Sequence, residues 1–229
     1  MSFVVQGRTS DSPYIEMVWH GHVIRDYAPV CPADVRWNLL FAKRDGRIRV
    51  SVEGPTTGFV PKTQSEGSEF LVIKFKLGTF MPYLPASKLV DADAFLPEGA
   101  GKSFCLDGST WQFPDFDNVE IFVERLVRQN ILVIDPLVSA AAQQAQQGHV
   151  ELSERTLRRR FLYATGLTHK TIQQIERAQQ AAALLEQGTP ILDAVYQLGY
   201  ADQPHLTRSL RRFIGSTPAQ IIRAAQVQV

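Results

Sequence analysis

The sequence predicts an α+β protein of two domains, with a small antiparallel β barrel or sandwich first and an all-α domain after it. Residues 35–53 form two runs of strand-forming side chains on either side of Asp45-Gly46, the pair that fits a type I′ hairpin turn. Beyond residue 113 the apolar side chains recur at helical spacing instead. A strand-rich region followed by a helix-rich region is the pattern of an α+β chain.

Further strands are predicted at residues 14–24 and 69–77, where apolar and charged side chains mix. Gly54-Pro55 and residues 82–85 interrupt the runs, and short helices are expected after Leu77. The large aromatic side chains are expected in the core, because a β domain this small needs them for packing. They are Trp19, Trp37, Phe41, Phe59 and Phe75.

An amphipathic helix is predicted between the two regions. Pro114 and Asp117-Asn118 give a start signal, and apolar residues then share one stripe. The stripe consists of Val119, Phe122, Val123, Leu126 and Val127. Such a stripe either packs on the β domain or pairs with a second subunit, and the sequence leaves both uses open.

Charge divides the chain in a similar way. Residues 1–124 hold 12 Lys and Arg against 16 Asp and Glu, a net charge of −4, and the remaining residues hold 12 against 7, a net charge of +5. A basic helical half is expected where one domain sits on phosphates and the other does not. The predicted division is residues 1–112 for the β domain, 113–130 for the connecting helix and 131–229 for the helical domain.

A helix, a tight turn and a second helix follow one another in residues 193–215. Gly199 suits the end of the first helix, because only glycine takes the left-handed conformation without a Cβ penalty. Asp202 can then cap the second helix, with Pro204 in its first turn, where a missing N–H costs nothing.

This second helix is predicted to have an apolar inner face of Leu206, Leu210 and Phe213 and a polar, cationic outer face. Gln and Arg form bidentate pairs with adenine and guanine edges in the major groove, so the outer residues are predicted to bind DNA. They are Gln203, Pro204, Thr207, Arg208 and Arg211. Taken alone, the same pattern also fits a solvated helix in a bundle.

A similar unit lies upstream. Ser153 is the predicted helix cap, and Leu157 and Phe161 face inward. The outward side chains predicted to bind DNA are Arg155, Arg158 and Arg159. Arg160 lies nearer the buried side and is expected to matter less.

In the first unit Leu157, Arg159 and Phe161 form a Leu-x-Arg-x-Phe pattern, which Gly166 follows, and the next helix carries Arg177, Ala181 or Ala182, and Leu185. The second unit carries Gly199-Tyr200, Asp202-Gln203, His205-Leu206-Thr207-Arg208, Gly215 and Thr217-Pro218. At these positions residues 134–223 resemble the DNA-binding domain of AraC/XylS-type transcription regulators. The chain departs from the family at Val195, Pro204 and Leu210, and residues 143–150 are longer and more polar than the family's tight turn.

The resemblance implies a sequence-specific regulator with two helix-turn-helix units joined by a linker helix at residues 169–186. At 1.5 Å a residue this helix spans about 27 Å, which brings the two reading helices roughly one turn of B-DNA apart, about 34 Å. One subunit would thus read two successive major grooves. The β domain looks like a cupin-like sensing domain of a poorly characterised subtype. Double-stranded DNA, a small-molecule effector, RNA polymerase and a second subunit are the implied partners, and the sign of regulation stays open.

Two other classes were weighed: a cupin-like enzyme with a helical accessory domain, and a nonspecific architectural DNA-binding protein. His20 and His22 form a His-x-His pair without a third ligand at a telling spacing, and Cys31 and Cys105 are isolated thiols. We therefore expect no catalytic residues, no metal and no cofactor. The sequence shows no 18-residue apolar run and no signal-peptide pattern, so a cytoplasmic protein without a membrane span is expected.

Overall fold

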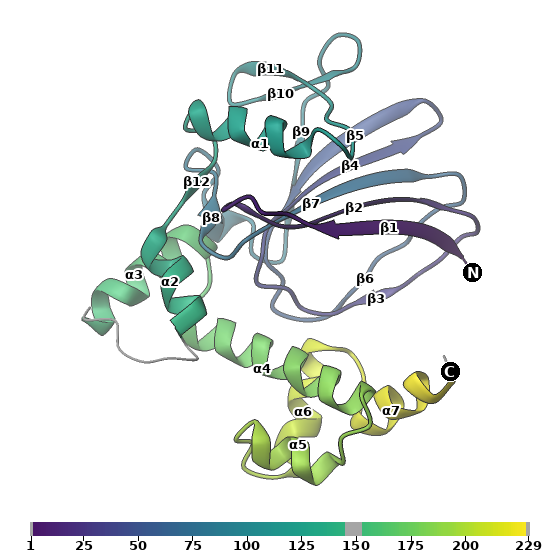
Figure 1. Ribbon diagram of the computed structural model, residues 1–229, viewed down its shortest axis with the longest axis vertical. Coiled ribbons are helices and arrows are strands. Elements are labelled where there is room, and N and C mark those ends of the chain that lie inside the picture. Colours follow the sequence, from purple (N-terminus) through teal and green to yellow (C-terminus); the bar gives the residue numbers. More distant parts are fainter. Residues whose placement is uncertain (1, 145–152, 228–229) are drawn as a thin grey trace. The chain divides into compact units, whose positions relative to one another are not determined.

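The computed structural model describes residues 2–144 and 153–227 (Figure 1). The N-terminal region is built mostly of antiparallel strands and the C-terminal region of helices, so the α+β prediction is confirmed. Most of the polar stretch predicted at residues 143–150 lies outside the described residues.

Contacts group the chain into two compact units, which we call the sheet unit and the helical unit. The described residues of the sheet unit lie within Met1–Ala28, Arg36–Pro55 and Thr63–Thr168, and those of the helical unit within Pro29–Val35, Thr56–Lys62 and His169–Val229. Two short segments of the N-terminal region therefore pack with the last helices. The predicted domain boundaries near residues 112 and 130 stay a prediction.

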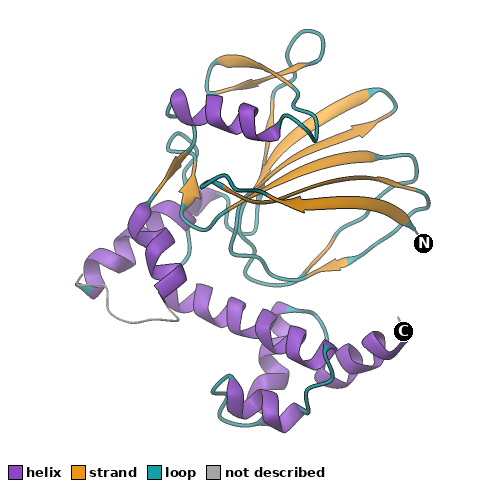
Figure 2. Cartoon of the chain, in the orientation of Figure 1, coloured by secondary structure: helices purple, strands orange, loops and turns teal. Residues whose placement is uncertain are grey.

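Six antiparallel strands form the main sheet of the sheet unit, in the order β1-β2-β7-β4-β5-β9 (Figures 1 and 2). They are β1 (Phe3–Thr9), β2 (Ile15–Val23), β4 (Asn38–Arg44), β5 (Arg47–Glu53), β7 (Glu69–Phe75) and β9 (Asp93–Leu96). Asp45 and Gly46 join β4 to β5 with φ angles of 51° and 77°. Positive φ at both positions is what a type I′ turn requires, so the predicted hairpin is confirmed.

Helix α1 (Val119–Arg128) turns its apolar stripe into the core of the sheet unit. Val119, Val123 and Leu126 have no exposed surface, and the ring of Phe122 lies 6.1 Å from that of Phe41 on β4. Burying apolar surface removes it from water, which favours this packing by about 25 cal/mol for each Å². Of the two uses that the sequence left open for the stripe, packing within the unit is therefore observed.

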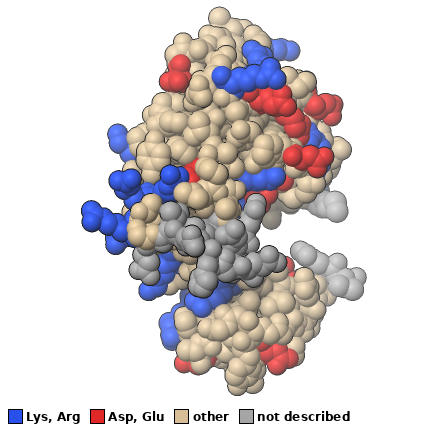
Figure 3. Space-filling model, turned by 60° about the vertical axis from the view of Figure 1, so that its left-hand side comes forward, with Lys and Arg blue, Asp and Glu red and all other residues tan. Residues whose placement is uncertain are grey.

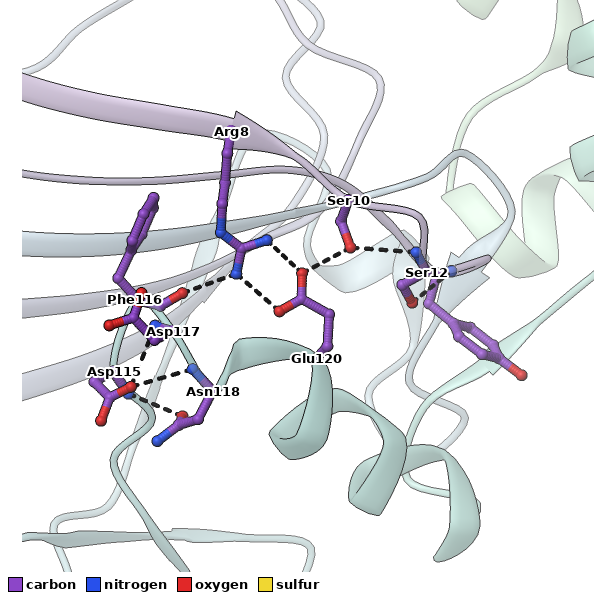
Figure 4. Close-up of polar contacts among 9 residues, drawn as sticks. Arg8, Ser10, Ser12, Asp115, Phe116, Asp117, Asn118 and Glu120 are labelled. Carbon is purple, nitrogen blue, oxygen red and sulfur yellow. Dashed lines mark hydrogen bonds and ion pairs between the residues drawn. The ribbon is translucent and has the colours of Figure 1, made fainter.

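An ion pair fixes the start of α1 to strand β1. The Arg8 guanidinium donates to both carboxylate oxygens of Glu120, with N–O distances of 2.5 and 2.8 Å, and to the carbonyl oxygen of Phe116 at 2.8 Å (Figure 4). The Ser10 hydroxyl adds a further bond to Glu120 at 2.8 Å. No sequence pattern predicts this contact between residues more than 100 positions apart.

For the β region, the expectation of short helices after Leu77 holds only in part, and the expected burial of Phe59 was wrong. After Leu77 the chain forms a single short 3₁₀ turn, η1 (Ala86–Lys88), and otherwise strands. These are β8 (Thr79–Phe80), β9, β10 (Ser103–Leu106) and β11 (Ser109–Gln112). Phe59 is 44% exposed rather than buried, because it belongs to the helical unit, where its ring lies against Gly215. Trp37, Phe41 and Phe75 are buried as predicted, and Trp19 is half-buried.

The first pair of C-terminal helices, α2 (Pro136–Gln144) and α3 (Glu154–Thr165), belongs to the sheet unit. The ring of Tyr163 on α3 meets Phe80 edge to face at 5.2 Å. Gly166 ends α3 with a φ of 74°, and a Cβ there would lie 2.7 Å from the carbonyl oxygen of Ala86 on η1. Glycine is thus required at this position both by backbone conformation and by space.

The helical unit contains the remaining helices, α4 (His169–Glu186), α5 (Ile191–Gln197), α6 (Gln203–Phe213) and α7 (Pro218–Val227), and the short strands β3 (Val30–Cys31) and β6 (Val60–Pro61). The predicted linker helix has the predicted bounds. Small side chains on α4, Ala181 and Ala182, let the neighbouring helices approach closely and share one apolar core with Leu206 and Leu210. This core fixes the orientation of α6.

Candidate nucleic-acid interface

The turn between α5 and α6 has the geometry that the sequence predicts. Gly199 has a φ of 64°, and the amide of Tyr200 donates to the carbonyl oxygen of Val195 at 3.0 Å, which closes the end of α5. A carboxylate oxygen of Asp202 accepts the backbone amide of His205 at 2.6 Å, as a helix cap does. The predicted glycine turn and the predicted cap are confirmed.

One face of α6 is buried in the core of the helical unit. Leu206 and Leu210 have no exposed surface and Phe213 only 3%. Because these three residues recur at helical spacing, their burial also decides which side chains must point away from the core.

The opposite face of α6 is polar and cationic. Gln203, Pro204, Arg208 and Arg211 are exposed, whereas Thr207 is half-buried and its hydroxyl donates to the carbonyl oxygen of Gln203 at 2.9 Å. Within the described residues, Arg208 and Arg211 form no ion pair with a carboxylate. The structure thus brings all five predicted residues of α6 to one side and leaves its guanidinium groups available to an anion.

On α3 the cap and the arginines also lie as predicted. Ser153 accepts the amide of Thr156, and Phe161 is completely buried. The exposed arginines are Arg155, Arg158 and Arg159. Arg160 instead donates to Asp135, so it is separated from the outer set. The predicted residues of α3 therefore gather on their own helix, within the sheet unit.

Residues outside the predicted set hold the C-terminal end of α6. The amide of Ala33 donates to the carbonyl oxygen of Phe213 at 2.7 Å, and the amide of Phe59 donates to that of Arg212 at 3.4 Å. The Gln179 side chain on α4 in turn donates to the carbonyl oxygen of Ala33 at 2.6 Å. The last carbonyls of a helix have no partner within the helix, so these bonds stabilise its end.

Sequence reasoning also missed Arg212 and the surroundings of Tyr200. Arg212 is exposed and lies one turn after Arg208, a spacing that would have placed it beside the predicted face. The guanidinium of Arg177 lies 4.6 Å from the centre of the Tyr200 ring, and the hydroxyl of Tyr200 is 3.2 Å from that of Ser209. Helical spacing alone gives no sign of this contact between α4 and the turn.

Acidic side chains are gathered elsewhere. Figure 3 shows that most of the Asp and Glu visible in that view lie over the β-rich part of the chain, in keeping with the net charge of −4 for residues 1–124.

In the described part of the chain, no three His, Cys, Asp or Glu side chains come together as a metal site. His20 of the His-x-His pair stacks on the ring of Phe116 at 4.2 Å.

Comparison with known families decides what kind of helical region this is. The model of a helix-turn-helix domain matches residues 148–224, which include α3, α4, α5 and α6. Residues 148–224 are a helix-turn-helix domain of the AraC type. The match thus covers the C-terminal third of the chain and includes α3 and α6, the two helices that the sequence predicts to bind DNA.

Part of the chain is similar to a curated regulator. The HTH-type transcriptional regulator VirS of Mycobacterium tuberculosis, in strains CDC 1551 and H37Rv, is 42% identical to this chain over 72 residues. That region is 31% of this chain, and the chain spans about one fifth, 21%, of the length of these relatives. No solved structure matches the chain. Among the described residues, no helix is both long and apolar enough to cross a membrane.

Proposed function

We propose that this chain is a sequence-specific transcription regulator that reads DNA with α6 and α3. The observation that carries the proposal is the outer face of α6, where Arg208 and Arg211 have no carboxylate partner among the described residues, on a helix whose other face is buried. A short cationic helix after a tight turn can enter the major groove. Its Gln203 and its arginines can pair with base edges there.

The proposed DNA-binding residues are those predicted from the sequence: Arg155, Arg158, Arg159, Gln203, Pro204, Thr207, Arg208 and Arg211. Their exposure supports the assignment, except that Thr207 is half-buried. We further propose that one subunit reads two successive major grooves. The 18 residues of α4 support this, since a helix of that length spans about 27 Å, close to one turn of B-DNA when the flanking helices are added.

The rest of the proposal concerns control. We propose that the β-rich region senses a small-molecule effector, that the chain works in the cytoplasm with RNA polymerase, and that it has no catalytic role. The similar protein VirS is a transcriptional regulator, which supports a role in transcription. A homodimer is part of the proposal, although the burial of the α1 stripe within the sheet unit removes the surface on which the sequence based it.

Selection of binding sites from a random duplex library tests the proposal. The full chain is expected to enrich one sequence and to keep it bound against an excess of random duplex DNA. Specific binding to DNA is typically tighter than nonspecific binding by a factor of about 10³ or more. An architectural DNA-binding protein would lose the selected duplex to the competitor, and an enzyme with an accessory helical domain would enrich no sequence.

A further inference from the structure

The helical unit contains a small cavity between α4 and α6, which we call the α4–α6 cavity. Its volume is about 170 Å³. It is lined by Gln174, Arg177, His205, Arg208, Ser209, Arg212 and Phe213. Sites that enclose drug-sized ligands usually measure about 300–1,000 Å³, so this one suits a single small group.

The charge of the α4–α6 cavity is uncompensated. Three guanidinium groups line it, those of Arg177, Arg208 and Arg212, and no carboxylate of the residues that the structure describes does. Elsewhere in the described part of the chain, two half-buried arginines meet acids, Arg8 with Glu120 and Arg160 with Asp135. Guanidinium groups present several N–H donors in a fixed plane that matches carboxylate and phosphate oxygens. Their convergence on one hollow therefore favours an oxyanion.

Arg177 shows that the cavity is built before any ligand arrives. Its guanidinium is held over the ring of Tyr200, and Tyr200 is itself held by Ser209 and by an edge contact with His205 at 5.1 Å. Its Nε is buried and finds no hydrogen-bond partner among the described residues. A buried donor without a partner is unfavourable, so the fold holds Arg177 beside the cavity at a cost in free energy.

The cavity lies along one side of α6. The cavity residues on this helix are at positions 205, 208, 209 and 212, a spacing that places them in a single stripe along the helix. Arg208 lies where this stripe meets the proposed base-reading face. When a helix enters the major groove its sides lie next to the sugar-phosphate backbone, and contacts there fix position rather than sequence. We propose that the α4–α6 cavity binds one phosphate of the DNA backbone, an inference that rests on the proposed DNA-binding function.

The test uses the full chain and its selected duplex, in which single phosphates are replaced one at a time by neutral methylphosphonates. Wild type is expected to lose about tenfold in affinity at one position, the loss of one charge-assisted contact. Arg212→Ala should bind the unmodified duplex with about tenfold lower affinity than wild type. Replacing the phosphate to which wild type is sensitive should not lower the affinity of this variant further. Its salt slope should fall by about 1, and its preference for the selected sequence should stay unchanged.

Arg223→Ala is the matched control, since Arg223 is exposed on α7 and does not line the cavity. It should keep the sensitivity of wild type to the modified phosphate. If Arg212→Ala and wild type respond alike to every replacement while both still bind the selected duplex, the phosphate site is refuted and the proposed function stands. If wild type selects no duplex, both fall.

Inorganic phosphate distinguishes a DNA phosphate from a free anion. It is titrated into the DNA-free chain and followed by NMR shifts of residues 205–212. Two results together would identify a site for free phosphate and overturn the proposal. The chain would bind inorganic phosphate only when Arg212 is present, and no methylphosphonate replacement would change its affinity for the duplex. The proposal predicts that inorganic phosphate competes with the duplex for wild type, and that this competition is absent in Arg212→Ala.

Discussion

Arg160 donates two hydrogen bonds to the carboxylate of Asp135, with N–O distances of 3.1 and 3.0 Å. The same carboxylate accepts the amides of Leu137 and Val138 at the start of α2. Arg160 therefore ties α3 to the capped end of α2. Its neighbour Arg159 is exposed and forms no ion pair within the described residues.

This difference predicts opposite effects for two neighbouring substitutions. Arg159→Ala should weaken binding to the selected duplex by about 1–3 kcal/mol if it pairs with a guanine edge, and leave the melting temperature unchanged. Arg160→Ala should lower the free energy of unfolding by up to about 1 kcal/mol, because the pair is partly exposed, and affect DNA affinity less. Titration of labelled duplex and urea unfolding check both. A larger loss of affinity in Arg160→Ala would mean that α3 presents another face.

Gly199 predicts a conformational effect on α6, the second helix that we propose reads DNA. A Cβ at this position would meet nothing within 4 Å, so any substitution acts through the backbone φ of 64° alone. Gly199→Val should lower the free energy of unfolding by more than about 1 kcal/mol and abolish specific binding. Gly199→Asn is the control, because asparagine tolerates the left-handed region better. Thermal melting that is the same for both variants would remove the argument.

The bond from Gln179 to Ala33 predicts that a residue in the middle of α4 supports the end of α6. Gln179→Ala should lower the free energy of unfolding by about 1 kcal/mol, because it removes the hydrogen bond to the carbonyl oxygen of Ala33. It should also loosen Ala33, whose amide donates to the carbonyl oxygen of Phe213. The neighbouring Gln180 is exposed on the same helix and its side chain forms no hydrogen bond within the described residues, so Gln180→Ala is the matched control. Urea unfolding of the two variants should differ, and equal stability would show that the contact contributes nothing.

Glu120 predicts a pH dependence. The hydrogen bonds from Arg8 lower the pKa of its carboxyl from 4.5 to about 2, outweighing the opposite effect of burial, and Ser10 adds to the lowering. Because the folded pKa lies below the unfolded one, the ion pair stabilises the protein fully above pH about 4.5 and loses that effect as the pH falls toward 2. The pair is about one-third exposed, so its contribution should be about 1 kcal/mol.

Glu120→Gln tests this. Its free energy of unfolding should fall below that of wild type at neutral pH, and the difference should shrink as the pH approaches about 2. Glu124→Gln, on the same helix, removes an exposed pair with Arg128 and should change little at any pH. A difference between Glu120→Gln and wild type that stays constant with pH would contradict the assignment.

Local signals predicted the helical region well. The caps at Ser153 and Asp202 and the glycine turn at Gly199 each involve residues a few positions apart, so the sequence displays them directly. The same logic was available at Asp107-Gly108, where φ angles of 48° and 72° make a hairpin between β10 and β11, yet that turn was missed. Reading the Asp-Gly signal wherever it occurs would have found it.

Contacts distant in sequence were not predictable in this way. Gln179 and Ala33 are 146 positions apart, and Arg8 and Glu120 are 112 apart. Strand β1 was also missed, because it lies at the sheet edge with all but Arg8 exposed and so shows no alternation of buried and exposed side chains. Such features depend on which surfaces meet in the folded chain, and neither helical nor strand periodicity records that.

The affinity of the full chain for its selected duplex, measured against random duplex of equal length and salt concentration, tests the central claim most directly. Sequence-specific reading by α6 predicts a ratio of about 10³ or more, which Arg211→Ala reduces while Arg223→Ala does not. Equal affinity for selected and random DNA, or a ratio that both variants leave unchanged, would contradict it.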